Sequence, residues 1–161
     1  MFRTAWRGEM LYLVDPYRVP RPGSGDATTF RIHPSTSSLS AKQADLDDAR
    51  AKAHALMHVV AANTSFRFIR EASVRAAERF EDGSLSFVFI DGAHEHGAVA
   101  QDLEAWWPKV AVGGIFAGHD YTSLFDVPKA LHPFLLKKAH RFCVADRAST
   151  ASFYLRKYAP T

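Results

Sequence analysis

The sequence predicts an α/β fold: a mostly parallel sheet with helices on both faces and an antiparallel hairpin at the carboxyl end. Two observations carry this prediction. Strand-like apolar segments alternate with helical patterns between residues 11 and 138, which is typical of parallel sheets. The last two strand candidates, residues 142–145 and 152–155, are joined by a short polar link, which suits a hairpin better than a helical crossover.

The first half of a predicted strand–helix–strand unit lies at the centre of the chain. Residues 85–90 place apolar side chains on both faces of a strand, which favours a central parallel strand. A helical stripe follows, in which Val99, Leu103 and Trp106 recur at helical spacing. Pro108 marks the end of this helix.

The second strand of the unit predicts where ligands bind. Gly113 and Gly114 are expected to turn the chain into a short strand at residues 115–117. Ligands of open α/β sheets bind beyond the carboxyl ends of the strands, where this sequence is rich in polar residues. We therefore expect one edge of the sheet to gather five side chains: Asp91, His94, His96, His119 and Asp120.

Weaker patterns predict the remaining elements. Further strands are expected at residues 11–14 and 66–69, and further helices at residues 40–62, 74–80 and 127–138. Ser40 and Gln43 have the spacing of a capping box at the start of the first helix. Residues 18–38 contain several prolines and glycines and predict a loop. Pro133 is expected to kink the last helix or to start a new segment.

Length and composition narrow the class of protein. The 161 residues predict a single domain over residues 1–161, with the 47% hydrophobic content of a soluble globular protein. The net charge is +3, and arginines concentrate toward the amino end. The sequence shows no motif typical of nucleic-acid-binding proteins, so nucleic acid is not an expected partner. No apolar run approaches the roughly 20 residues that span a membrane. The single cysteine, Cys143, excludes an internal disulfide and predicts a cytoplasmic protein.

Four motifs resemble those of a known family. They are LYLVDPY at residues 11–17, SLSFVFIDGAHEH at 84–96, DLEAWWPKV at 102–110 and GGIFAGHDY at 113–121. In this order and spacing the chain resembles class I S-adenosylmethionine-dependent methyltransferases, specifically methyltransferase family 24. The resemblance implies a Rossmann-like sheet, S-adenosylmethionine as cofactor and a small-molecule acceptor.

The resemblance also implies roles for individual residues. Asp15 matches the acidic residue that binds the two ribose hydroxyls, and Ser73 lies where the family contacts adenine. Asp91, Gly92 and Ala93 match the segment near the sulfonium end of the cofactor. His119 and Asp120 lie where metal-dependent relatives of this fold carry a metal-binding pair, which makes Asp91 and Asp120 candidate ligands of Mg²⁺.

One departure from the family concerns the amino end. The family's first strand and the glycine-rich loop after it have no counterpart here, because only ten residues precede the strand at residues 11–14. We therefore expect an amino-terminally truncated version of the fold, with weak cofactor binding and little turnover. The two strands that flank the absent one would have exposed edges, through which the chain could form a homo-oligomer.

Three hypotheses of function follow. The first is methyl transfer to an oxygen of a small hydroxylated acceptor, with His119 or His94 as base and with Asp91 and Asp120 orienting it or holding a divalent ion. The second is a non-catalytic remnant or partner subunit with the same fold. The third is a metal-dependent hydrolase that uses His94, His96, His119 and Asp91.

Overall fold

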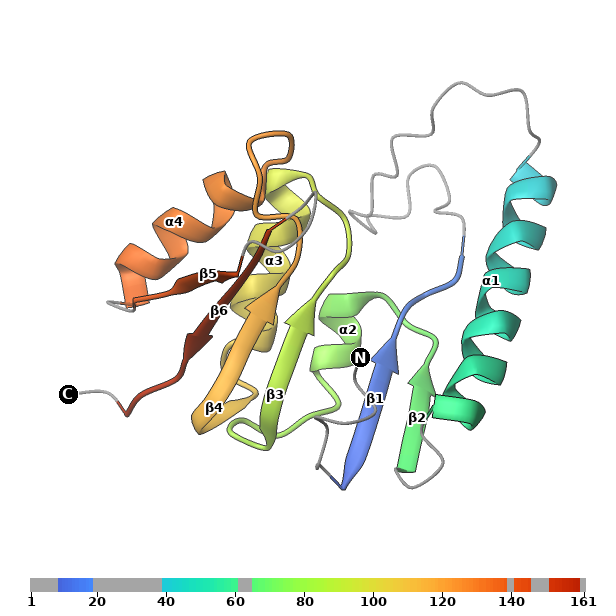
Figure 1. The fold of residues 1–161 in the computed structure, drawn as a ribbon, viewed down its shortest axis with the longest axis horizontal. Helices are drawn as coiled ribbons and strands as arrows, with labels where there is room; N and C mark the ends of the chain where they lie inside the picture. Colours follow the sequence, from blue (N-terminus) through green and yellow to red (C-terminus); the bar gives the residue numbers. More distant parts are fainter. Residues whose placement is uncertain (1–8, 19–38, 61–64, 139–140, 146–150, 160–161) are drawn as a thin grey trace. The chain divides into compact units, whose positions relative to one another are not determined.

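The computed structural model describes residues 9–18, 39–60, 65–138, 141–145 and 151–159 (Figure 1). Within these ranges strands and helices alternate as far as the fourth helix, and two further strands follow. The predicted α/β fold is confirmed. Residue contacts divide the described chain into two compact units, the first ending at Ala76 and the second beginning at Ala77.

The first unit contains a pair of parallel strands. Strand β1 (Met10–Val14) and strand β2 (Ser65–Ile69) are connected in the chain through helix α1 (Leu39–Val60). Val14 pairs with Ile69, so the two strands end together. Both strands begin one residue before their predicted bounds. The loop predicted at residues 18–38 lies, from residue 19 on, outside the described residues.

Helix α1 contacts β2 through aromatic rings. The imidazole of His54 stacks on Phe68 with 4.3 Å between ring centroids, and His58 meets the edge of Phe66 at 5.0 Å. The helix begins at Leu39, so Ser40 lies inside it and not at the predicted cap position. Ends of helices are the least predictable part of a sequence pattern.

The second unit is built on the predicted strand–helix–strand arrangement. Strand β3 (Leu85–Ile90) has the predicted bounds, and helix α3 (His96–Trp106) leads to strand β4 (Val110–Gly118), which is parallel to β3. Strand β4 is longer than predicted. Gly113 does not turn the chain out of the strand; it sits within β4 with φ of +84°, near a shift in the register between β3 and β4.

Three elements complete this unit. Helix α4 (Val127–Lys138) has the predicted bounds and continues through Pro133, so the prediction of a new segment there is wrong. Strands β5 (Cys143–Ala145) and β6 (Ser152–Arg156) form the predicted antiparallel hairpin. The strand order is β3-β4-β6-β5, which places β6 between β4 and β5 and leaves β5 at an edge (Figure 1).

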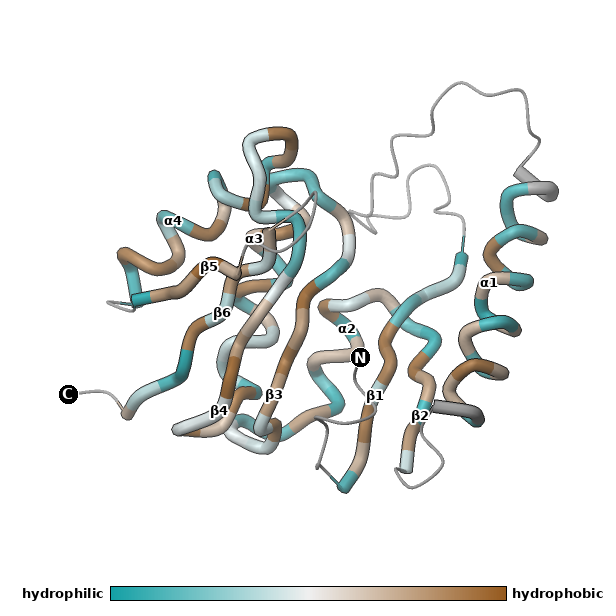
Figure 2. The backbone as a smooth tube through the Cα atoms, in the orientation of Figure 1, coloured by the Kyte–Doolittle hydropathy of each residue, from teal (hydrophilic) through white to brown (hydrophobic). Residues whose placement is uncertain are grey.

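The core of the second unit lies between the sheet and helices α3 and α4. The predicted stripe of α3 is buried, with Leu103 fully enclosed. Phe116 of β4 is also fully buried, and its ring lies 5.6 Å from Trp107 and 6.4 Å from Phe134 of α4. Figure 2 shows the hydrophobic colouring that runs along β3 and β4. Burial of these large side chains is the main stabilising contribution.

Strand β3 was predicted to be a central strand buried on both faces, and the structure differs on both points. Val88 is buried, but Phe89 on the opposite face is 38% exposed. Among the described strands β3 pairs with β4 alone. Strand β1 likewise pairs only with β2 in the described part of the chain.

Helix α2 (Ser73–Ala77) precedes β3 and ends three residues before its predicted end. None of the helices in the described ranges is long and apolar enough to cross a membrane.

Candidate functional site

The register of two parallel strands brings the candidate site together. Strand β3 ends at Ile90 and β4 ends at Gly118, and these two residues are partners in the sheet. The next residues, Asp91 and His119, therefore emerge side by side, and the His119 amide donates a hydrogen bond to the Ile90 carbonyl at 3.0 Å. Their proximity was predictable because parallel strands end at one edge.

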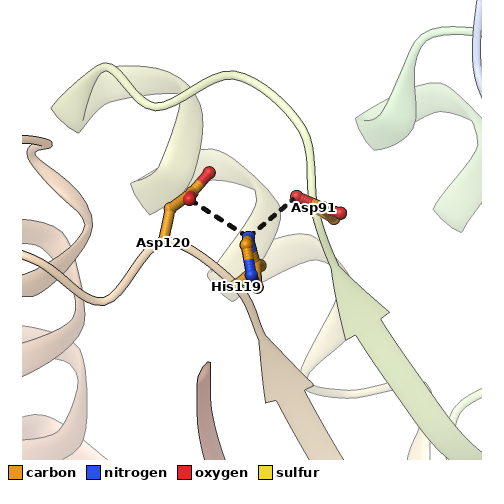
Figure 3. A group of neighbouring side chains, drawn as sticks. All are labelled: Asp91, His119 and Asp120. Carbon is orange, nitrogen blue, oxygen red and sulfur yellow. Dashed lines mark ion pairs between the residues drawn. The ribbon is translucent and has the colours of Figure 1, made fainter. Parts of the chain in front are cut away.

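His119 lies between two carboxylates (Figure 3). Its Nδ1 is 3.0 Å from Oδ1 of Asp120 and 3.8 Å from Oδ1 of Asp91. The side chain of Asp120 is 11% exposed, whereas that of Asp91 is 56% exposed. At 3.0 Å, Oδ1 of Asp120 is placed to accept a proton carried by Nδ1, which would leave the lone pair of the neutral imidazole on Nε2. This is the arrangement of a base and its orienting carboxylate.

The backbone of Asp120 adopts an uncommon conformation. Its φ is +57°, in the left-handed region, where aspartate is tolerated better than most residues. The Asp120 carbonyl accepts a hydrogen bond from Thr122 N at 2.8 Å, and Tyr121 N donates to the Ala151 carbonyl at 2.9 Å. These contacts fix the turn that directs the Asp120 carboxylate back toward His119.

His94 connects the loop after β3 to the loop after β4. Its Nε2 is 2.6 Å from Oδ2 of Asp120, so one carboxylate lies between two imidazoles. The His94 ring stacks on Phe125 with centroids 4.4 Å apart, and its carbonyl accepts a hydrogen bond from Asp126 N at 3.2 Å. A hydrogen bond from Lys129 lowers the pKa of Asp126.

A small hollow adjoins these side chains. Its volume is about 10 Å³, and it is lined by Asp91, His94, His119 and Asp120 together with apolar groups of Val99, Val127 and Phe153. That volume is close to the space one water molecule needs. The hollow can therefore take a water, an ion or one small group, while a larger ligand would lie outside it.

His96 is not part of this hollow. It lies at the start of α3 and lines a separate groove of about 180 Å³ between α3 and α4, together with Glu104 and Lys137. The predicted gathering of five side chains is therefore wrong for His96 and correct for the other four. The hydrolase hypothesis loses one of its proposed ligands by this placement.

The predicted residues Gly92 and Ala93 also line the hollow, and the two remaining predicted site residues lie in the first unit. Asp15 follows β1, is exposed, and accepts a hydrogen bond from Tyr17 N on Oδ1 at 2.5 Å. Burial of the ring and the neighbouring Asp15 carboxylate raise the pKa of Tyr17. Ser73 is the first residue of α2, a few residues after the end of β2.

The sequence patterns did not predict two residues that lie near these sites. Asp102 is 8% exposed and occupies the buried stripe of α3, three residues after Val99. A carboxylate at an apolar position was the signal that could have identified it. Its Oδ2 lies 3.7 Å from where a Cβ on Gly92 would be, so it sits beside the loop after β3. Arg70, directly after β2, contacts the turn that carries Asp15.

The sequence matches one family model. The model of methyltransferase family 24, described as a methyltransferase domain, matches residues 6–121. No curated protein matches the chain.

Solved methyltransferases share the fold at low sequence identity. The O-methyltransferase NovP has a TM-score of 0.60 at 14% identity, with 93% of this chain and 60% of NovP covered. An rRNA methylase from Streptococcus thermophilus gives 0.55 at 12% identity, with 94% of this chain and 89% of that chain covered. A Streptococcus mutans protein solved with SAH gives 0.52 at 10% identity, with 69% and 71% covered. The chain thus spans less than two thirds of the length of NovP.

Proposed function

This chain belongs to methyltransferase family 24, and from that premise we propose that it transfers the methyl group of S-adenosylmethionine to an oxygen of a small hydroxylated acceptor. The observation that supports a hydroxyl acceptor is the pairing of His119 Nδ1 with Asp120 Oδ1 at 3.0 Å. A hydroxyl must lose its proton as it is methylated, and an oriented imidazole can take that proton.

The proposed reaction is a single in-line displacement. The acceptor oxygen attacks the methyl carbon, a C–O bond forms, and the C–S bond breaks with its electron pair passing to sulfur. The products are the methylated acceptor and S-adenosylhomocysteine. The acceptor proton passes to Nε2 of His119, and the resulting imidazolium is stabilised by the Asp120 carboxylate 3.0 Å from Nδ1.

In this scheme His94 positions Asp120. The 2.6 Å contact to Oδ2 of Asp120 and the stacking on Phe125 support this role. His94 also lines the hollow, so it remains the alternative base.

A divalent ion is the second candidate for activating the acceptor. The ligand atoms of Asp91, His119 and Asp120 all lie within 4.8 Å of one another, which fits a metal ion. Two carboxylates and an imidazole suit transition metals better than Mg²⁺, which prefers oxygen ligands. When bound, such an ion would lower the pKa of the acceptor hydroxyl as a Lewis acid. His119 Nδ1 cannot donate a proton to Asp120 and ligate a metal at once, so the two candidates are distinct.

We expect turnover to persist in EDTA, because the His119–Asp120 ion pair supplies the proposed base without a metal ion. The measurement is release of S-adenosylhomocysteine from chain treated with EDTA and then desalted, with untreated chain as control. If EDTA abolishes turnover and added Mg²⁺ or Mn²⁺ restores it, a bound metal ion and not His119 activates the acceptor.

The proposed cofactor contacts follow from the family match. Asp15 would accept hydrogen bonds from the ribose hydroxyls, Ser73 would contact adenine, and Asp91, Gly92 and Ala93 would lie near the sulfonium end. The exposed carboxylate of Asp15 at the end of β1 supports the first of these assignments. A carboxylate accepts hydrogen bonds only, which matches two hydroxyl donors.

Replacing Asp15 with Ala is expected to weaken S-adenosylmethionine binding by about 1.5–3 kcal/mol, because charge-assisted hydrogen bonds to ribose are lost. Isothermal titration calorimetry measures the change. Asp45→Ala is the control, since Asp45 is an exposed carboxylate of α1 in the same unit. Equal affinity of the wild-type chain and Asp15→Ala would contradict the ribose assignment.

A further inference from the structure

The turn that presents Asp15 has a conformation that needs support. Tyr17 has φ of +42°, in the left-handed region that residues other than glycine seldom adopt. The local contact within the turn is the hydrogen bond from Tyr17 N to Asp15 Oδ1. One exposed hydrogen bond contributes about 1 kcal/mol, which only offsets the cost of a left-handed residue. Because this leaves no net stabilisation of the turn, contacts from other elements are needed to hold it.

Arg70 supplies such contacts from the end of β2. Its Nε donates to the Pro16 carbonyl at 3.3 Å, and its Nη2 donates to the Tyr17 carbonyl at 3.2 Å. One planar guanidinium thus holds two successive carbonyls of the turn. A guanidinium presents its donors in a fixed fork, so it can fix the orientation of both peptide groups.

Helix α1 holds the guanidinium in place. Nη2 of Arg70 is 3.0 Å from Oδ1 of Asp47, which anchors it to the helix. The amide of Gln43 donates to the same Asp47 oxygen at 3.2 Å and to the Tyr17 carbonyl at 2.9 Å. Three elements therefore converge on the turn: β1, which it follows, β2 through Arg70, and α1 through Gln43 and Asp47.

The energetics favour a role in geometry over a role in stability. The side chains of Arg70 and Asp47 are 46% and 48% exposed, and exposed ion pairs contribute about 0–1 kcal/mol to folding. Loss of the Arg70 side chain would therefore leave the fold intact. It would, however, make the turn of residues 15–17 more mobile and with it the Asp15 carboxylate. Rigid placement of a binding group lowers the entropy lost on binding.

We propose that Arg70 is a positioning residue for the cofactor, which holds the turn of residues 15–17 so that the Asp15 carboxylate meets the ribose hydroxyls. This inference rests on the proposed function, in which Asp15 binds the ribose. Arg70 acts through its contacts to the Pro16 and Tyr17 carbonyls, and its charge is neutralised by Asp47.

The test compares dissociation constants for S-adenosylhomocysteine by calorimetry. Arg70→Met is expected to raise the constant by about tenfold, the size of coupling common between contacting residues. Arg70→Lys should restore part of the loss, because an ammonium can reach a carbonyl but lacks the fork. Arg67→Met is the matched control, because Arg67 is an exposed arginine of β2 three residues before Arg70. Melting temperatures confirm that each variant is folded.

A double-mutant cycle separates positioning from a general structural role. In an Asp15→Ala background Arg70→Met is expected to have no further effect on the dissociation constant, since the group it positions is gone. An equal tenfold loss in both backgrounds would overturn the inference. If Asp15→Ala weakens binding and Arg70→Met does not, the inference fails and the proposed function stands. If neither variant nor the wild-type chain binds, the proposed function fails instead.

Discussion

Replacing His119 with Ala is expected to slow methyl transfer by about 10²–10⁴-fold, the usual contribution of a general base. The expectation follows from the position of the imidazole, whose Nδ1 is 3.0 Å from the buried Asp120 carboxylate. Release of S-adenosylhomocysteine measures turnover whatever the acceptor is, and a panel of small hydroxylated compounds provides the acceptor. The dissociation constant for the cofactor should change little, so the loss should appear in kcat.

Two histidines serve as comparisons. His96→Ala should have no effect on turnover, because this exposed side chain lines the groove between α3 and α4. His94→Ala should reduce turnover less than His119→Ala, since its proposed role is to position Asp120. A larger loss for His94→Ala would make His94 the base. Binding of cofactor without turnover of any acceptor by the wild-type chain would favour a non-catalytic partner subunit.

Replacing Gly118 with Ala is expected to destabilise the second unit by about 3 kcal/mol, through overpacking next to the site. A Cβ at Gly118 would lie 2.5 Å from Cε1 of Phe153 and 2.9 Å from the Ile90 carbonyl oxygen. Phe153 is buried and the Ile90 carbonyl belongs to β3, so neither neighbour can move away without disturbing the sheet. Denaturant unfolding measures the loss as a lower midpoint.

Gly97→Ala is the matched control for this prediction. No atom lies within 4 Å of where its Cβ would be, and the residue is exposed near the start of α3. Alanine favours helix over glycine, so this variant should be as stable as the wild-type chain or more stable by up to about 1 kcal/mol. Equal unfolding midpoints for the two variants would show that the close packing at Gly118 does not limit stability.

The parts of the fold that the sequence predicted are those set by strong periodic patterns. The bounds of β3 and α4 were predicted to the residue, and Val99, Leu103 and Trp106 are buried on α3. These patterns are local consequences of hydrophobic burial. The start of β4 was misjudged because Gly113 and Gly114 look like a turn, whereas tertiary pairing with β3 carries the strand through them.

The candidate site was predictable in place but not in detail. Residues after neighbouring parallel strands must meet, so Asp91 and His119 could be placed together from their positions alone. The left-handed backbone of Asp120 and its contact with His94 depend on how two loops fold against each other. The packing of the two loops has no periodic pattern in the sequence, so it could not be predicted. The contacts that Arg70 makes with the turn after β1 could not be predicted for the same reason.

The position of β6 in the sheet has a consequence for protein synthesis. Residues 152–156 lie between β4 and β5, although they are the last of these strands to be made. Until they emerge from the ribosome, Gly118 lacks its partner Phe153 and Tyr121 lacks the Ala151 carbonyl that its amide contacts. A nascent chain that has not yet reached residue 151 therefore carries His119 and Asp120 but lacks the contact that holds the turn at Tyr121. The β4 edge that β6 covers stays open for the same interval, so we expect the unfinished chain to be more prone to aggregation than the complete one.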